Sequence, residues 1–198
     1  MHKYIIMGPQ GCGKGTQARL LCQDYDLVHI SIGDIFRWNM KNHTKLAARV
    51  QRIMNQGRLV PDEIVHEVVR KRLDEHDWNY GFVLDGFPRT RAQAEFLFEN
   101  YNLDKAIYLD VPSEVVYQRV MHRARVGEGS DSSKRADDNP EALRVRLQEY
   151  EKNTAPLLEL FEQKQMLVRV DGTRSIEEVY QLVRQALHLP EPAGSEGG

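Results

Sequence analysis

Cysteine, long apolar runs and net charge are all scarce in this sequence. Cys12 and Cys22 are the only cysteines among 198 residues, and they form neither a disulfide framework nor a zinc-ligand pattern. No apolar run approaches the roughly 20 residues that cross a membrane. The formal net charge is only −2, so no overall field attracts nucleic acid or an anionic membrane. We therefore expect no structural zinc, no nucleic-acid partner and no membrane partner.

The length and composition are those of a globular protein. A chain of 198 residues can bury the core of one domain, and 41% hydrophobic with 28% charged residues is typical of such domains. The first residues run directly into an apolar segment, which leaves no room for a signal or transit peptide. Together with the scarcity of cysteine, this predicts a cytoplasmic location.

A glycine-rich segment, Gly8–Thr16, is the most informative feature of the chain. It follows the apolar run Tyr4–Met7 and precedes a helix-compatible stretch, Thr16–Tyr25, which is the context that a phosphate-binding P-loop requires. Its backbone N–H groups and the following helix N-terminus would converge on phosphate. Lys14 can reach the β- and γ-phosphates, and the Thr16 hydroxyl would lie near Mg²⁺. The alternative is a glycine-rich turn between a strand and a helix.

Strand-like and helix-like segments alternate along the chain. This alternation predicts an α/β fold with a parallel sheet covered by helices on both faces. Short apolar runs predict five strands, at Ile5–Met7, Val28–Ile30, Phe82–Leu84, Ala106–Leu109 and Leu167–Val170. Helical periodicity appears between them, at Ile64–Leu73, Ala92–Phe98, Val115–Val120 and Leu143–Phe161.

Three segments depart from this alternation. The stretch from about Ile32 to Val60 carries two helical patterns and no strand, so it reads as a small helical insertion. Gly127–Lys134 is rich in glycine, serine and charge, which favours a flexible loop. The last residues, 189–198, are rich in proline, glycine and glutamate and are predicted to be disordered.

The third predicted strand ends in chemically useful residues. Asp85 follows its apolar run directly, where an acid in a P-loop fold can hold Mg²⁺ or its waters; otherwise it caps the turn at Gly86. Arg89 leaves the same turn and can clamp a phosphate with two hydrogen bonds, although an isolated arginine there is usually solvated. The P-loop favours the functional interpretation of both residues.

Three strings give the chain a family resemblance. Gly13–Thr16 reads Gly-Lys-Gly-Thr, Ser31–Arg37 reads Ser-Ile-Gly-Asp-Ile-Phe-Arg, and Asp85–Thr90 reads Asp-Gly-Phe-Pro-Arg-Thr. Together they resemble the adenylate kinases, which are nucleoside monophosphate kinases, and the resemblance extends from Met1 to about Leu187. The region between Arg123 and Arg135 is short and lacks cysteine, as in the short-lid form of the family.

The resemblance implies an architecture and a reaction. The fold would be a P-loop three-layer α/β/α structure with a central parallel five-stranded sheet, a helical acceptor-binding insertion and a short lid loop. The core would comprise 1–31, 61–123 and 137–188, the nucleoside monophosphate-binding insertion 32–60, the lid 124–136 and the tail 189–198. The enzyme would convert ATP and AMP to two ADP with Mg²⁺, as a monomer, and the lid would exclude water as it closes.

The resemblance also implies roles for individual residues. The catalytic set would be Lys14, Arg89, Arg123, Arg135 and Arg146. The ATP-binding set would be Gly11, Cys12, Gly13, Lys14, Gly15, Thr16, Arg119, Arg123 and Arg174. The AMP-binding set would be Ser31, Ile32, Arg37, Arg58, Val60, Gly86, Arg89, Gln93, Arg135 and Arg146. Mg²⁺ would be held by Asp85 through water, with Thr16 as a further candidate.

One position departs from the family pattern and leaves alternatives open. Ile32 stands where many adenylate kinases have threonine near the acceptor base, whereas Gln93 matches a glutamine that reads adenine. A UMP or CMP kinase of the same fold is therefore an alternative. A P-loop hydrolase and an inactive nucleotide-binding module are less favoured, because the arginines around the site fit two nucleotides better than one.

The cysteines and histidines indicate less. Cys12 lies in the anion loop beside a helix N-terminus, so it is either a reactive thiol or a small residue that fills the loop. His29, His66 and His122 have no ligand partner in the sequence, and we read them as structural or surface residues.

Overall fold

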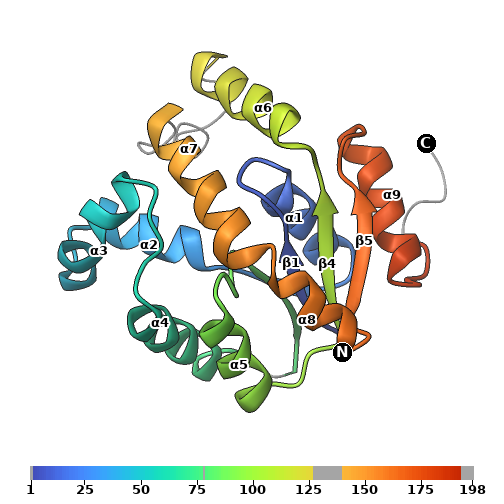
Figure 1. Cartoon of the computed structure of the whole chain (residues 1–198). Helices are drawn as coiled ribbons and strands as arrows, with labels where there is room; N and C mark the ends of the chain where they lie inside the picture. Colours follow the sequence, from blue (N-terminus) through green and yellow to red (C-terminus); the bar gives the residue numbers. More distant parts are fainter. Residues whose placement is uncertain (1, 78, 127–139, 193–198) are drawn as a thin grey trace.

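A parallel five-stranded sheet forms the centre of the computed structural model, which describes the chain apart from residues 1, 78, 127–139 and 193–198 and the side chains of 123–126. The strand order is β2-β3-β1-β4-β5 (Figure 1). The strands are β1 (Lys3–Met7), β2 (Leu27–Ser31), β3 (Gly81–Asp85), β4 (Lys105–Asp110) and β5 (Leu167–Asp171). Each of the five predicted apolar runs lies within one of them, so the predicted α/β fold with a five-stranded parallel sheet is confirmed.

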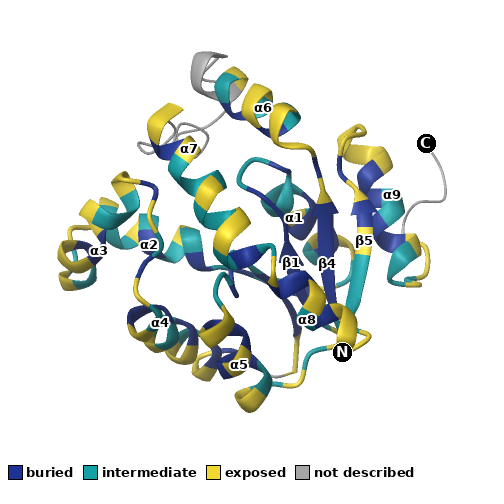
Figure 2. Cartoon of the chain, in the orientation of Figure 1, coloured by how far each residue is buried: buried dark blue, intermediate teal, exposed yellow. Residues whose placement is uncertain are grey.

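The central strand supplies both faces of the core. Ile5 and Met7 pack into one buried cluster and Tyr4 and Ile6 into the other, because successive side chains of a strand point to opposite faces. Figure 2 shows β1 and β4 buried along most of their length, whereas the edge strand β5 is mostly intermediate or exposed. The first cluster lies under α4 (Asp62–Asp74), α5 (Arg91–Asn100) and α8 (Leu157–Gln163), and the second under α1 (Lys14–Asp24) and α9 (Ile176–Ala186).

The strand order locates where ligands bind in such a sheet. From β1 the chain passes first to β2 and β3 on one side and then to β4 and β5 on the other. The order therefore reverses at β1, and parallel α/β sheets bind ligands at the carboxyl end of that point. The glycine-rich segment leaves β1 at this end.

Between β2 and α4 the chain forms two helices and no strand. These are α2 (Ile32–Lys41) and α3 (Lys45–Asn55), which stand away from the sheet in Figure 1. Both begin at a hydroxyl cap: the Ser31 Oγ accepts from the Asp34 N–H at 3.3 Å, and the Thr44 Oγ1 accepts from the Ala47 N–H at 3.3 Å. These caps fix where each helix starts, and the first places Ile32 directly after β2.

The long helical stretch predicted over Leu143–Phe161 is interrupted in the structure. It consists of α7 (Pro140–Glu149), a π-helical turn η1 (Tyr150–Thr154) and α8. The Ala155 N–H donates to the Tyr150 carbonyl at 2.8 Å, five residues back, and Pro156 has no N–H to continue an α-helical ladder. The wider turn buries Thr154 against the turn that carries Arg89, a consequence that helical periodicity does not reveal.

The predicted lid, 124–136, lies outside the described residues except for the backbone at the end of α6 (Ser113–Val126). Of the tail predicted to be disordered, 189–198, the structure describes residues 189–192, and these make contacts with the rest of the chain. The Tyr25 hydroxyl donates to the Pro190 carbonyl at 2.6 Å, and Glu191 pairs with Arg184 at 2.5 Å. These tertiary contacts hold the chain against α1 and α9 as far as Pro192. In the described part of the chain, every helix is too short or too polar to cross a membrane.

Candidate active site

The glycine-rich loop between β1 and α1 is shaped by left-handed backbone. Gly13 has φ of 107° and accepts from the N–H groups of Thr16 and Gln17 at 3.0 and 3.1 Å, so it begins α1 in a conformation that favours glycine. Gly11, with φ of 85°, is also pressed against α6, where a Cβ would lie 2.4 Å from the Val120 side chain. The loop therefore keeps its backbone at the N-terminus of α1.

Lys14 reaches back across this loop. Its Nζ donates to the carbonyls of Gly8 and Pro9, each at 2.8 Å, and lies 3.7 Å from the Cys12 Sγ. The ammonium is thus held at the mouth of the loop, where a phosphate chain would meet it. Cys12 itself is 2% exposed and packs into the core beneath the loop.

Asp85 lies at the carboxyl end of β3, facing the start of α1. Its Oδ2 is 3.5 Å from the point that a Cβ on Gly15 would occupy and 3.5 Å from the His29 Nε2. Burial raises the pKa of the Asp85 carboxyl, but contact with His29 and the charges of Lys14 and Arg89 outweigh it and lower the pKa below its usual range. Asp85 is therefore an ionised carboxylate. Its neighbour is His29, which the sequence predicts to be a structural or surface residue.

Arg89 is held by the turn that follows β3. Its Nε donates to the Gly86 carbonyl at 2.9 Å, and its own carbonyl accepts from the Thr154 hydroxyl at 2.9 Å. Burial and the nearby charge of Arg37 lower the pKa of the Arg89 guanidinium, while Asp85 raises it. The two arginines thus repel one another across the site, and an anion between them would relieve that repulsion.

Two adjoining pockets meet at this point. One extends from the α2–α3 insertion and includes Ile32, Arg37 and Gln93, while the other extends to Lys14 and the glycine-rich loop. The residues common to both are Gln10, Leu59, Gly86, Arg89 and Arg146. Arg89 and Arg146 therefore stand between two compartments, which is the arrangement needed to bridge a donor and an acceptor phosphate.

The first pocket gathers most of the predicted acceptor-binding residues. Ile32 is 2% exposed and Gln93 2% exposed, so both present little more than the surface that faces the pocket. Arg37 pairs with Asp34 one turn before it, and its Nε donates to Asp34 at 3.1 Å. The predicted residues on this pocket are Ile32, Arg37, Arg58, Val60, Gly86, Arg89, Gln93 and Arg146, whereas Ser31 caps α2 beside it.

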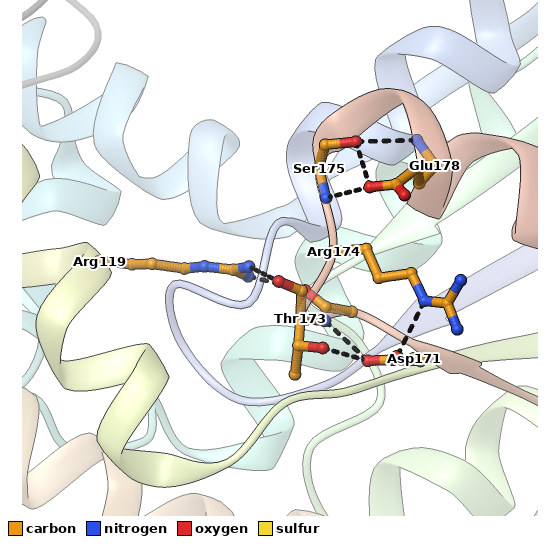
Figure 3. A network of polar contacts seen from close by, with 7 residues as sticks. Arg119, Asp171, Thr173, Arg174, Ser175 and Glu178 are labelled. Atoms are coloured by element: carbon orange, nitrogen blue, oxygen red, sulfur yellow. Dashed lines mark hydrogen bonds and ion pairs between the residues drawn. The ribbon is translucent and has the colours of Figure 1, made fainter.

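Arg119 joins the glycine-rich loop to the loop that follows β5. Figure 3 shows its guanidinium extending to this second loop, where it donates to the Gly172 carbonyl at 2.9 Å and the Thr173 carbonyl at 3.2 Å. It also donates to the Cys12 carbonyl at 3.4 Å. Three backbone carbonyls thus hold a flat cation at the P-loop, in a position suited to stacking against a base.

Asp171 shapes the loop that receives Arg119. Its Oδ1 accepts from the Thr173 N–H at 2.9 Å and from the Thr173 hydroxyl at 2.6 Å, and its Oδ2 accepts from the Arg174 Nε at 3.1 Å (Figure 3). These hydrogen bonds lower the pKa of Asp171 to about 2. Arg174, a predicted ATP ligand, is therefore engaged with Asp171 in this structure.

The remaining predicted residues are distributed as follows. Arg146 lies between the two pockets, and its guanidinium donates to the Met54 carbonyl of α3 at 3.3 Å. Thr16 lies in the first turn of α1, directly after Gly15, which faces Asp85. The Arg123 side chain and Arg135 lie outside the described residues. The roles assigned to all these residues stay predictions.

Comparison with known proteins identifies the family. A family model of adenylate kinases matches residues 6–166. The chain belongs to the adenylate kinase family. It is 43% identical to an adenylate kinase of Thermobifida fusca over 93% of this chain and 97% of the relative. It is 42% identical to that of Bifidobacterium longum, over 89% and 95%. The adenylate kinase of Clostridium tetani is 39% identical, over 92% and 97%.

The described part of the chain holds no cluster of metal-ligating side chains. There, no group of three histidine, cysteine, aspartate or glutamate side chains is placed to hold a metal ion. Asp85 and Thr16 are the residues that fit Mg²⁺ bound with a nucleotide, because hard oxygen ligands and one or two protein groups suffice for it.

Sequence reasoning missed three residues of the site. Thr154 supports the Arg89 carbonyl from η1, and Gln10 lines both pockets. Asp62, the first residue of α4, accepts hydrogen bonds from Thr90 and Gln93. Asp62 and Gln93 are 31 residues apart in the chain, and only the fold brings them together.

Proposed function

We propose that this protein transfers the γ-phosphoryl group of Mg²⁺·ATP to AMP and so interconverts ATP plus AMP with two ADP. Its membership of the adenylate kinase family makes it a nucleoside monophosphate phosphotransferase. The observation that carries the finer proposal is the pair of adjoining pockets that share Arg89 and Arg146. One leads to the P-loop and the other to a buried glutamine, which suits a polyphosphate donor and a base-bearing acceptor.

The transfer needs positioning and charge neutralisation rather than a general base. An acceptor phosphate oxygen forms a bond to the γ-phosphorus while the bond between the γ-phosphorus and the β,γ-bridging oxygen breaks. The bridging oxygen leaves as part of ADP. Lys14 would bind the β- and γ-oxygens, and Arg37 and Arg89 the acceptor phosphate. Arg146, and in our proposal Arg123 and Arg135, would surround the transferring group. The repulsion between Arg37 and Arg89 supports an anion site between them.

The donor side fits a nucleotide with Mg²⁺. The ionised Asp85 carboxylate, held through water, and the Thr16 hydroxyl are the groups that would hold the ion beside the P-loop. When bound, Mg²⁺ neutralises charge on the phosphate oxygens. The donor base would lie against Arg119, whose guanidinium is fixed by three carbonyls.

AMP is the acceptor that the first pocket supports best. Gln93 contributes an amide to a pocket whose apolar residues include Ile32, Val60 and Val65. An amide can read an amino group beside a ring nitrogen, as adenine presents them. UMP or CMP remains the alternative acceptor because Ile32 differs from the common threonine. A monomeric, cytoplasmic enzyme without nucleic-acid or membrane partners also remains our prediction.

Initial rates of ADP formation test the proposal. The assay uses Mg²⁺·ATP with AMP, dAMP, CMP, UMP or GMP as the acceptor. We expect a strong preference for AMP, with ADP formed only when a monophosphate is added. A preference for CMP or UMP would reject AMP while leaving the phosphotransferase intact, and Ile32→Thr would then be the first variant to make. Phosphate release without an acceptor would indicate a hydrolase, and binding without turnover an inactive module.

A further inference from the structure

A closed set of hydrogen bonds surrounds the Gln93 side chain. Gln93 lies in the first turn of α5, and Asp62 begins the neighbouring helix α4 (Figure 1). The Asp62 Oδ1 accepts from the Gln93 Nε2 at 2.8 Å and from the Thr90 hydroxyl at 2.8 Å. The Thr90 Oγ1 in turn accepts from the Gln93 N–H at 3.3 Å. The backbone of Gln93 is thus tied to Thr90 and its side chain to Asp62, and these two residues are hydrogen-bonded to one another.

This arrangement fixes which end of the amide faces which way. The Arg89 N–H donates to the Gln93 Oε1 at 2.8 Å. A backbone N–H can only donate and an ionised carboxylate can only accept. Turning the amide over would set its NH₂ group against the Arg89 N–H and its oxygen against the Asp62 carboxylate. Both contacts would become repulsive, so the two partners independently select one orientation.

The occupied sites determine what Gln93 can offer to a ligand. A glutamine amide has two N–H donors and two acceptor lone pairs. Asp62 takes one donor and Arg89 takes one lone pair, which leaves one donor and one acceptor. Since Gln93 is 2% exposed and lines the acceptor pocket, these remaining groups are available only to what enters that pocket. The donor and acceptor are presented in a fixed order.

A fixed order distinguishes two kinds of purine. Adenine presents an amino donor at C6 beside an unprotonated N1, whereas hypoxanthine and guanine present a C6 carbonyl beside an N1–H. A glutamine that is free to turn over can serve either edge. One whose amide is locked serves one edge and opposes the other, leaving buried polar groups unpaired.

We propose that Asp62 is a specificity-determining residue that acts through Gln93. By locking the Gln93 amide, it favours a 6-amino purine monophosphate over a 6-oxo purine monophosphate as the acceptor. This inference rests on the proposed function, because it takes the first pocket as the site of the acceptor base. Asp62 touches no substrate in this account; it positions the residue that does.

The test compares AMP with IMP, which differ only in the edge that Gln93 would read. The measured quantity is kcat/KM for AMP divided by kcat/KM for IMP, in wild type, Asp62→Asn and Asp62→Ala. An asparagine can accept from the glutamine nitrogen or donate to its oxygen, so it removes the preference that Asp62 adds to that of the Arg89 N–H. Alanine removes the hydrogen-bond partner of Gln93 altogether, and the ratio for Asp62→Ala is used if Asp62→Asn does not fold. We expect the ratio to fall at least tenfold in either variant, chiefly through KM for the acceptor.

Glu63→Gln is the matched control. It removes the same charge from the same first turn of α4, but Glu63 is exposed and, within the described residues, forms no hydrogen bond with Gln93. Its ratio should equal that of wild type. An equal loss of activity with both acceptors in the Asp62 variants would mean that Asp62 only ties α4 to α5, and would overturn the inference. A wild-type enzyme that prefers a pyrimidine acceptor would overturn the proposed function first, before any variant is measured.

Discussion

Lys14 and Arg89 are both cations of the candidate site, but the fold holds them differently. The Lys14 ammonium rests on the carbonyls of Gly8 and Pro9 at the end of a flexible stem, so it can follow a phosphate that moves. The Arg89 guanidinium is half-buried near Asp85 and tied to the Gly86 carbonyl, so it is fixed before any ligand arrives. One residue is suited to the transferring group and the other to an acceptor held in place.

Replacing either cation by alanine should therefore impair the reaction itself. We expect Lys14→Ala and Arg89→Ala each to lower kcat/KM at least a hundredfold, about 3 kcal/mol of transition-state stabilisation. Steady-state rates with Mg²⁺·ATP and AMP measure this. Arg91→Ala is the control, because Arg91 is exposed, pairs with Glu95 and lies two residues from Arg89. Turnover close to wild type in either site variant would reject the role assigned to it.

At the scale of single elements, the loop after β5 has a second role besides leading into α9. Asp171 folds it so that the Gly172 and Thr173 carbonyls face Arg119. The Ser175–Glu178 capping box then starts α9 directly behind it. The position of Arg119 against the P-loop therefore depends on hydrogen bonds within the loop that joins β5 to α9.

Asp171→Ala should weaken the donor site selectively. Without the carboxylate the loop loses its three hydrogen bonds, and we expect KM for ATP to rise about fivefold to tenfold, while KM for AMP stays unchanged. Asp171→Asn keeps an acceptor for the Thr173 N–H and should lie between alanine and wild type. Glu162→Gln is the control. It breaks an exposed ion pair with Arg169, which lies on β5 together with Asp171. A parallel rise in both KM values would contradict a role confined to the donor site.

The same residue makes a prediction about acid. The pKa of Asp171 is lowered from 3.8 to about 2, first by its hydrogen bonds to Thr173. A carboxyl whose pKa is lower in the folded state stabilises the protein above its unfolded pKa, and this contribution is lost as the pH falls through the folded pKa. The difference in free energy of unfolding between wild type and Asp171→Asn should be constant from pH 8 to about 5 and shrink towards pH 2. Urea titrations across this range measure it, and a difference that grows with acid would refute it.

At the scale of the whole molecule, the sequence predicts the sheet well because each strand is a local signal. Five apolar runs mark the five strands, and Gly8–Thr16 marks the loop after the first. The contacts that it does not predict join residues far apart in the chain. His29 lies against Asp85, Asp62 binds Gln93, and Thr154 supports Arg89 through an irregular turn. None of these follows from periodicity, since each depends on which helices and strands become neighbours.

The end of the chain is the remaining case, because composition does not reveal the contacts that residues 189–192 make. Proline, glycine and glutamate predicted disorder from residue 189, yet Glu191 reaches the guanidinium of Arg184, which is 4% exposed. Arg184 also donates to the Tyr25 hydroxyl and to the Gln181 Oε1, each at 3.0 Å. A buried cation needs its partners, so one carboxylate anchors the end of the chain to α9 and, through Tyr25, to the residue after α1.

Glu191→Ala should therefore destabilise the fold without affecting the reaction. We expect the free energy of unfolding to fall by about 1 kcal/mol, less than for a fully buried pair because the Glu191 side chain is mostly exposed. Urea denaturation measures the loss, and kcat/KM with AMP should match wild type because Glu191 lines neither pocket of the candidate site. Glu95→Ala removes the carboxylate from an exposed pair with Arg91 and should cost under about 0.5 kcal/mol. If the two variants unfold alike, Arg184 is satisfied without the end of the chain, and the anchoring role of Glu191 is wrong.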